Sequence, residues 1–530
     1  MAALRDPQGG LIFGGGGNAA AQARWVFHVS LTTYDADSNL RPVIAQKIPS
    51  LADGDWKVLP DGGMELTWKL RPNVKWHDGT PLTADDFVFG IQVIKDPTVD
   101  FGSGSLASVN LSGVSEVTAP DPQTLVVHWS KPYFDANVAS PPSVSALPRH
   151  LLLDLYKQSD PSAFMNSPYW TTSFVGLGPF KLTEWNLGSY LDGAAFDDYF
   201  LGRPKIDRVI IKLIPDNQAV VASLLSGDID MVAPSTLKMS DLQPVIQQWG
   251  TEGGSIIPSM TQVVQARPQF RDPSAPWAQD VRVRQGLLHL IDRQTLADVL
   301  EGVPEGGPAD VFAAKTDPTY RLAEQRGFSR YPYDMNRGLA LLADAGWTRA
   351  ADGSIQNAAG QHFKIDTMVQ ANTQVNVQYG LAVQDNWRRS GVESELIQLP
   401  SNSANPNEMK AKSTGVWLQP EDLGSSALAM FQASNIASAQ NNWIGINLTA
   451  YSNPEFERRW ADYTGTLDVT QRQSVNADLL KWLSDEVIFF PLFYTVGSSI
   501  TAHRRAVRGP TAVTNVQRIG TWNINEWELD

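Results

Sequence analysis

Cysteine is absent from this sequence of 530 residues. The chain can therefore form no disulfide framework, no thiolate metal site, no iron–sulfur cluster and no cysteine nucleophile. Its stability must come from packing, which a chain of this length can supply. The lack of cysteine favours an exported protein that avoids stray oxidation, with a reduced cytosolic protein as the alternative.

Long apolar runs are also scarce. The longest, residues 487–496, contains Pro491 and is far shorter than the roughly 18 apolar residues of a membrane span, so it predicts a buried strand. Residues 1–23 lack the charged, apolar and small-residue regions of a signal peptide. We therefore expect that a signal segment was removed from the chain or never existed.

The charge balance is acidic, with 42 Lys and Arg against 56 Asp and Glu, a net charge of −14. This balance argues against nucleic acid or an anionic membrane surface as the main partner. The 42% of hydrophobic residues indicates a globular protein, and the length predicts two or three domains.

Motifs for catalysis are missing. The seven histidines form no HExxH pair, no serine lies in a GxSxG frame, and neither a phosphate loop nor a GxGxxG after a strand is present. Zinc enzymes, serine hydrolases, nucleotidases and dinucleotide enzymes thus lose support. Neighbouring acids such as Glu421 and Asp422 leave a carbohydrate-active enzyme as a less favoured alternative.

Periodic patterns predict strands and helices in alternation. Residues 64–70 alternate apolar and polar side chains, which predicts a half-buried strand, and residues 124–129 predict another. Thr83 and Asp86 form a capping-box pattern ahead of a helix over 87–94.

The second half follows the same pattern. Asp216 is expected to cap a helix over 217–226, and Asp280 one over 281–290. A strand over 363–370, a helix over 374–390 and a strand over 392–399 would form a βαβ unit, so at least part of the sheet should be parallel. The fold class is therefore α/β.

Tryptophan is abundant, with 17 residues, several of them beside turn residues. Trp185, Trp417 and Trp443 are examples. Aromatic rings can line a ligand cleft, but packing in a core is their commoner use.

One long segment carries a family resemblance. Residues 68–86 read WKLRPNVKWHDGTPLTADD, and further matching blocks follow in order at 176–185, 204–209, 224–230, 280–292, 331–347 and 447–456. This series resembles the peptide/nickel-type solute-binding proteins of ABC importers, solute-binding protein family 5. The resemblance extends over roughly residues 31–510. The segment before it is shorter and richer in glycine than in the family.

The resemblance implies a two-lobed α/β periplasmic-binding-protein fold of the cluster C type, with a hinge and an extra subdomain in lobe I. We expect the main subdomain of lobe I to comprise residues 1–30, 166–258 and 489–530, the extra subdomain residues 31–165, and lobe II residues 259–488.

The resemblance also implies function. It predicts an exported substrate-binding protein of an ABC transporter, periplasmic or extracellular and free or tethered in its precursor. It would capture an oligopeptide or similar small solute between its lobes and deliver it to a permease and ATPase complex. A monomer without catalysis, cofactor or metal is expected, with no nucleic acid partner. A receptor for an oligosaccharide or another non-peptide solute is the alternative.

Family position suggests the ligand contacts. The candidates are Gly415, Val416, Trp417, Gln419, Glu421, Asn442, Trp443, Phe101, Trp185 and Arg267. Among them, Gly415 would let the backbone approach the ligand, Trp417 would stack and Gln419 would hydrogen-bond. Alternatively, Gly415 would belong to a turn, Trp417 to the core and Gln419 to a solvated loop. Arg267 is expected to meet a carboxylate or to structure the hinge, and Trp185 is more easily explained by packing.

The block around Trp417 departs from the family. In peptide-binding members an aspartate three residues after this tryptophan pairs with the α-amino group of the peptide. Here Pro420 stands at that position. Either Glu421 or Asp422 would have to substitute; otherwise the ligand is uncharged or differently charged.

Overall fold

The structure is a computed structural model. It describes residues 1–3, 11–12, 18–36, 39–96, 98–99, 111, 113–139, 144–158, 160–234, 236–250, 253–300, 307–315, 317–371, 374–400, 405–497, 499–513 and 519–530. The chain divides into two compact units. Unit 1 comprises Met1–Ser259 and Ser498–Asp530, and unit 2 comprises Met260–Gly497. The chain thus passes twice from one unit to the other.

Unit 1 contains a seven-stranded mixed sheet. In order across the sheet its strands are β12 (Gly254–Pro258), β20 (Ile500–Arg504), β11 (Met231–Val232), β1 (Ala2–Ala3), β10 (Arg208–Leu213), β9 (Tyr190–Ala195) and β8 (Phe180–Asn186). The short β1 pairs in parallel with both β10 and β11. The first residues of the chain therefore join the two halves of this sheet.

A second, four-stranded antiparallel sheet lies within residues 56–129 of unit 1. Its strands are β4 (Trp56–Val58), β5 (Met64–Lys69), β7 (Thr124–Trp129) and β6 (Val114–Asp121). Burial alternates along β5, as its sequence pattern predicts. Helix α2 (Ala84–Lys95) begins at the predicted capping box, where Thr83 N donates to Asp86 Oδ2 at 2.9 Å.

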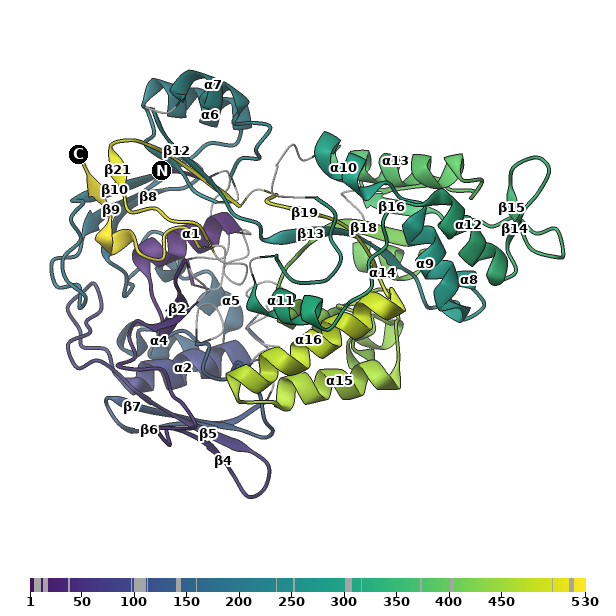
Figure 1. Ribbon diagram of the computed structural model, residues 1–530. Helices are drawn as coiled ribbons and strands as arrows, with labels where there is room; N and C mark the ends of the chain where they lie inside the picture. Colours follow the sequence, from purple (N-terminus) through teal and green to yellow (C-terminus); the bar gives the residue numbers. More distant parts are fainter. Residues whose placement is uncertain are drawn as a thin grey trace. The chain divides into compact units, whose positions relative to one another are not determined.

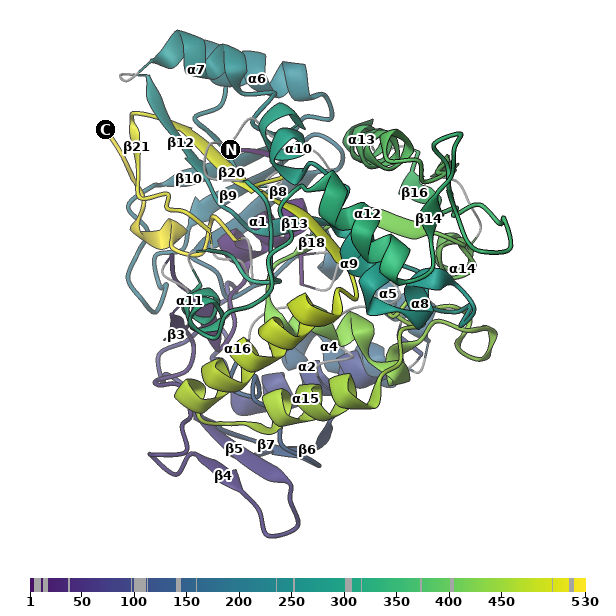
Figure 2. The ribbon, with the colours of Figure 1, turned by 45° about the vertical axis from the view of Figure 1, so that its right-hand side comes forward.

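The remaining elements of unit 1 are mostly short. They are the helices α1 (Asn18–Phe27), α4 (Arg149–Lys157), α5 (Pro161–Met165), α6 (Asn217–Ser226) and α7 (Gln243–Trp249), the 3-10 turns η1 (Pro168–Trp170) and η5 (Ile524–Glu526), and the strand pairs β2 (Thr32–Tyr34) with β3 (Leu40–Pro42) and β21 (Val507–Arg508) with β22 (Glu528–Leu529). Asp216 caps α6 as predicted, and Gly227 ends it with φ +86°. Helices α6 and α7 lie side by side (Figure 2).

Unit 2 is built on a five-stranded sheet in the order β17, β16, β18, β13, β19. These are β17 (Leu396–Leu399), β16 (Thr367–Gln370), β18 (Val416–Asp422), β13 (Gln262–Pro268) and β19 (Phe490–Thr495). Strand β16 pairs in parallel with β17 and β18, whereas β13 pairs antiparallel with β18 and β19. The predicted βαβ unit is confirmed, with α13 (Gln374–Arg389) joining β16 to β17.

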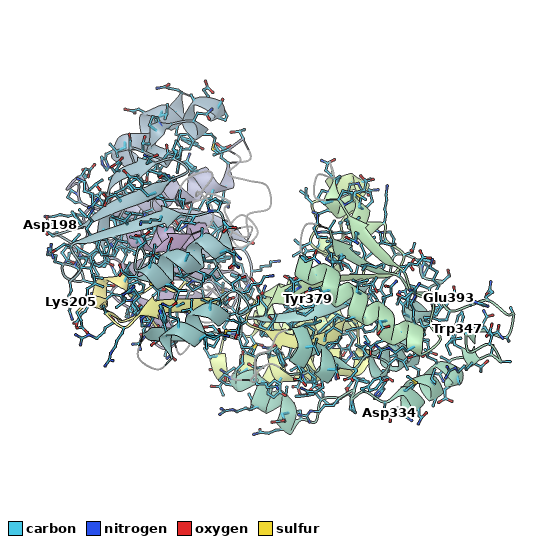
Figure 3. The ribbon with its side chains drawn as sticks, turned by 90° about the horizontal axis from the view of Figure 1, so that it is seen from above. Asp198, Lys205, Asp334, Trp347, Tyr379 and Glu393 are labelled. Carbon is cyan, nitrogen blue, oxygen red and sulfur yellow. The ribbon has the colours of Figure 1, made fainter. Side chains whose placement is uncertain are left out.

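Opposite faces of this sheet meet different helices (Figure 1). Gly380 of α13 approaches Leu396, Val369 and Thr367 so closely that a Cβ would lie within 3.5 Å of each. Helix α14 (Pro406–Ala411) reaches the other face, where Lys410 lies over Trp417. On the α13 side the large apolar core forms, and Tyr379, labelled in Figure 3, packs there against Phe493 with ring centroids 5.3 Å apart.

The other elements of unit 2 surround this sheet. They are α8 (Pro276–Gln279), α9 (Val281–His289), α10 (Arg293–Leu300), α11 (Pro318–Gln325), α12 (Met335–Asp344), α15 (Pro454–Gly465), α16 (Val469–Glu486), the hairpin of β14 (Thr348–Arg349) and β15 (Ile355–Gln356), and the 3-10 turns η2 (Ser425–Phe431), η3 (Ala433–Asn435) and η4 (Ala439–Asn441). Asp280 caps α9 as predicted, accepting from Arg282 N at 2.8 Å. None of the helices in the described part of the chain is long and apolar enough to cross a membrane.

The expected end of lobe II at residue 488 differs from the observed division. Residues 490–495 form β19, which is entirely buried and pairs with β13 inside unit 2. The predicted buried strand over 487–496 is thus confirmed, but it belongs to unit 2, and the chain leaves that unit only at Gly497. The further division of unit 1 into two subdomains stays a prediction.

Candidate functional site

The face of the unit 2 sheet that meets α14 carries polar side chains. Side chains alternate along a strand, so Trp417, Gln419 and Glu421 of β18 share one face. The antiparallel register places Arg267 opposite Trp417 and Gln265 opposite Gln419 on β13. We call these five residues the polar face.

A chain of hydrogen bonds runs along the polar face. Trp417 Nε1 donates to Gln419 Oε1 at 2.8 Å, and Gln419 Nε2 donates to Glu421 Oε2 at 2.9 Å. Glu421 Oε2 in turn lies 3.6 Å from Arg267 Nη2. The four side chains therefore form one connected network, which ends on a buried cation.

Arg267 is poorly compensated for so buried a charge. Its side chain is 4% exposed, and Nη1 donates to the thioether of Met430 at 2.9 Å, a weak acceptor. Within the described part of the chain, Arg267 Nε and Gln265 Oε1 have no hydrogen-bond partner. Burial lowers the pKa of Arg267, and Glu421 raises it in part. The polar face therefore has unused hydrogen-bonding capacity in a desolvated place.

A second cation stands at the same face. Lys410 Nζ lies 4.4 Å from the centroid of the Trp417 ring, a cation–π contact. Burial lowers the pKa of Lys410 and so does the positive charge of Arg267, while Glu421 raises it. Arg267 and Lys410 therefore both interact electrostatically with the carboxylate of Glu421.

An apolar pocket adjoins Trp417. Met368 and Leu399 pack with Trp417 in one small cluster, and both also line a pocket of about 470 Å³. Its lining residues are Met368, Ile397, Leu399, Glu408, Met409, Lys412, Ser413 and Thr414. A volume of this size is within the range of small-molecule sites.

Gly415 and Val416 do not belong to the polar face. A Cβ at Gly415 would lie 1.9 Å from the carbonyl oxygen of Asp366, so the glycine allows a close approach of backbone to backbone. Val416 is fully buried in the core on the α13 side. The structure thus gives both residues a packing role.

Asn442 and Trp443 lie in a separate turn after η4. Both have positive φ, 51° and 62°, which is unusual for an aromatic residue. Two cations lie over the ring of Trp443, with Arg271 Cζ 5.6 Å and Lys412 Nζ 5.1 Å from its centroid. Since Lys412 also lines the pocket, Trp443 is joined to the pocket rim and not to the polar face.

Two of the candidates come from the first half of the chain. Trp185 of β8 is 5% exposed and packs in the apolar core of unit 1. Phe101 lies outside the described residues. The structure therefore unites Arg267, Trp417, Gln419 and Glu421, four of the ten candidates.

Of the two acids that follow Pro420, only Glu421 reaches the polar face. Asp422 is exposed and accepts a hydrogen bond from Gln262 at 3.1 Å. The pairing of β18 with β16 extends only over Val416 and Trp417, so β18 needs no amide donor to β16 at Pro420.

Sequence reasoning missed Gln265, Lys410 and Met430. Gln265 stands two residues before Arg267, a spacing that puts both on one face of a strand, so a strand prediction over 262–268 would have found it. Lys410 and Met430 reach the site from α14 and η2, and no local pattern signals such contacts.

The sequence and fold have clear relatives. A family model described as bacterial extracellular solute-binding proteins, family 5 Middle, matches residues 46–442. The oligopeptide-binding protein AppA of Bacillus subtilis is 25% identical over 473 residues, which cover 88% of this chain and 80% of AppA. A putative ABC transporter peptide-binding protein of Brucella ovis is 26% identical over 294 residues, 56% of this chain and 51% of that protein.

Solved structures agree over the whole chain. NikZ from Campylobacter jejuni, in complex with Ni(L-His), has a TM-score of 0.75 at 22% identity, covering 99% of this chain and 98% of NikZ. AppA from Bacillus subtilis, in complex with a nonapeptide, has a TM-score of 0.71 at 20% identity, covering 100% and 98%. These likenesses confirm the predicted two-lobed α/β fold class. The names of these relatives describe binding proteins and not enzymes.

Proposed function

Because the chain belongs to family 5 of the bacterial extracellular solute-binding proteins, we propose that it captures an oligopeptide or similar small solute outside the cytoplasm and delivers it to an ABC permease. Its relatives are named as oligopeptide-binding and ABC transporter peptide-binding proteins, which supports a peptide-class ligand. The chain then acts as a receptor, and the transport step belongs to the membrane complex.

The observation that carries this proposal is the unsatisfied polarity of the polar face. A buried polar atom without a partner costs free energy, so native proteins rarely retain one without a reason. Arg267 Nε and Gln265 Oε1 are two such atoms within the described part of the chain, and both lie on the same face of the sheet. A peptide supplies both donors and acceptors that satisfy them.

The direction of β18 suits an extended ligand. Glu421 lies near the end of β18, next to Asp422, which pairs with Gln262. Gln262 stands two residues after Met260, where the chain enters unit 2. Trp417 lies four residues from Glu421, about 13 Å away at the usual rise of a strand. An extended peptide of about four residues matches this span.

The oligosaccharide alternative receives less support from this site. Recognition of a sugar face by tryptophan needs an open ring surface. Trp417 is 3% exposed, with Lys410 over its ring and Met368 and Leu399 packed against it. Its ring is therefore occupied by the protein itself.

Thermal unfolding with candidate ligands tests the proposal. Peptide mixtures at about 100 times the dissociation constant should add roughly 2.7 kcal/mol of apparent stability, and oligosaccharides should add none. Native mass spectrometry of the purified protein should detect co-purified peptide. Glu421→Gln should weaken the peptide effect, whereas Asp422→Asn, on the neighbouring exposed side chain, should leave it intact. Stabilisation by sugars alone would contradict the proposal.

A further inference from the structure

The charges of the polar face do not balance. Arg267 and Lys410 are cations, and both interact electrostatically with the carboxylate of Glu421. Lys410 forms no ion pair within the described part of the chain, unlike its neighbour Lys412, which pairs with Glu408 at 2.6 Å. One positive charge in this half-buried place thus lacks a counter-charge.

The donors of Arg267 are arranged for a better acceptor than they have. Nε has no partner among the described residues, and Nη1 contacts only the sulfur of Met430. A carboxylate oxygen accepts a charge-assisted hydrogen bond about twice as strong as a neutral one. Met430 has an unbranched, adaptable side chain, so a ligand oxygen can displace it at small cost.

The space between Arg267 and Lys410 is unsuited to an ammonium group. Glu421 Oε2 already accepts from Gln419 and lies 3.6 Å from Arg267. An α-amino group placed between Arg267 and Lys410 would add a third cation beside a single carboxylate. Electrostatics therefore favours the other end of a peptide.

The apolar pocket lies where the last side chain of such a peptide would go. It shares Met368 and Leu399 with the cluster around Trp417, and Trp417 holds the Lys410 ammonium over its ring. A group held at Lys410 is therefore next to an apolar cavity of about 470 Å³.

We infer that the ligand is a peptide held by its terminal carboxylate between Arg267 and Lys410, with an apolar last side chain in the pocket beside Trp417. This inference rests on the proposed function, since it names the ligand end that the polar face binds. The peptide then runs along β18 from Trp417 toward Glu421.

Two matched peptide pools test the inference. Both consist of tetrapeptides that end in leucine, one pool with free carboxylates and the other with terminal amides. Calorimetric titration should show binding of the free acids about ten- to a hundredfold tighter than that of the amides, the range expected for hydrogen bonds to a charged group. A third pool that ends in lysine should bind more weakly than the leucine acids.

Variants assign the effect to residues. Lys410→Met should weaken binding of the free acids by about tenfold or more and change binding of the amides little. Lys481→Met is the control, because that half-buried lysine of α16 is already paired with Asp485 at 2.7 Å. Arg267→Gln should weaken binding of the free acids in the same way as Lys410→Met. If the buried Arg267 variant fails to fold, the Lys410→Met variant alone decides the test.

Equal binding of acids and amides, or a Lys410→Met variant that binds like the control, would overturn the inference and leave the receptor proposal standing. Failure of every peptide pool to bind, with binding of a co-purified solute of another class, would overturn both.

Discussion

The carboxylate of Glu421 lies 3.6 Å from the guanidinium of Arg267, a side chain that is only 4% exposed. The two residues come from antiparallel strands that are 154 positions apart in the sequence, yet the register places Glu421 opposite Val263 on the same strand as Arg267. This pair links the stability of the unit 2 sheet to its proposed ligand site.

Removal of the charge at Glu421 should destabilise the protein. Glu421→Gln leaves the buried Arg267 without its carboxylate, and the free energy of unfolding should fall by about 1–3 kcal/mol. Urea unfolding measures this change. Asp422→Asn should alter it by less than about 0.5 kcal/mol, because Asp422 is exposed and an amide oxygen still accepts from Gln262. Equal losses in both variants would contradict the role given to Glu421.

Gly415 should tolerate no side chain. In Gly415→Ala the new Cβ would lie 1.9 Å from the backbone oxygen of Asp366, so β18 would have to move. We expect a loss of about 1–3 kcal/mol in the free energy of unfolding. The control is Gly465→Ala, where no atom lies within 4 Å of the added Cβ and a helical alanine should be neutral or slightly stabilising. Unchanged stability of Gly415→Ala would refute the packing role.

Trp417 should contribute to stability in two separable ways. Trp417→Phe keeps a ring against Met368 and Leu399 but removes the indole donor to Gln419, so the loss should be about 1–2 kcal/mol. Trp417→Ala also opens a cavity and should cost about 3–5 kcal/mol. Chemical denaturation of both variants gives the two values. If the alanine variant were no less stable than the phenylalanine variant, Trp417 would not be a packing residue.

Histidine burial in unit 1 should make stability depend on pH. Burial lowers the pKa of His28 to about 3, with Arg24 and His77 adding to the effect, and both ring nitrogens lack a partner within the described residues. The unfolded chain binds this proton near pH 6.5, so the unfolded state takes up protons first as the pH falls. The contribution of His28 is therefore present above about pH 6.5 and is lost progressively toward pH 3.

His28→Phe isolates that contribution. The ring of His28 stacks with Trp76 at 6.1 Å and meets Phe174 edge-on at 6.2 Å, surroundings that suit phenylalanine. The variant should be more stable by about 1–3 kcal/mol at neutral pH and lose stability less steeply between pH 6.5 and 4. Part of the pH dependence of stability should remain in this variant, because burial also lowers the pKa of His77, to about 4. Thermal unfolding across this pH range measures the difference. If stability fell as steeply with pH in the variant as in the unsubstituted protein, the prediction would be refuted.

Local chemistry made much of the fold predictable. The capping box of Thr83 and Asp86, the cap at Asp216 and the alternation along β5 all follow from hydrogen bonds and side-chain periods that span a few residues. The predicted strand boundaries were less accurate where a side chain replaces a backbone hydrogen bond of the sheet. Asp366 Oδ1 accepts from Glu395 N at 3.0 Å, which interrupts the regular ladder, so β16 and β17 begin later than residues 363 and 392.

The site was only partly predictable, because its contacts are non-local. Trp417, Gln419 and Glu421 were proposed from family position alone, and the structure places them on one face of β18. The burial of Arg267 depends on Met430, 163 residues away, and the place of Lys410 over Trp417 depends on how α14 packs. Gly415 was expected to face a ligand, whereas the backbone of Asp366 occupies that space.

Hydrogen exchange can show whether the ligand binds to the polar face of the unit 2 sheet. The protein is compared with and without a saturating tetrapeptide acid pool. Binding at the polar face should increase protection in Gln262–Pro268, Val416–Asp422 and Pro406–Ala411. Protection confined to other segments, with these three unchanged despite saturated binding, would contradict it.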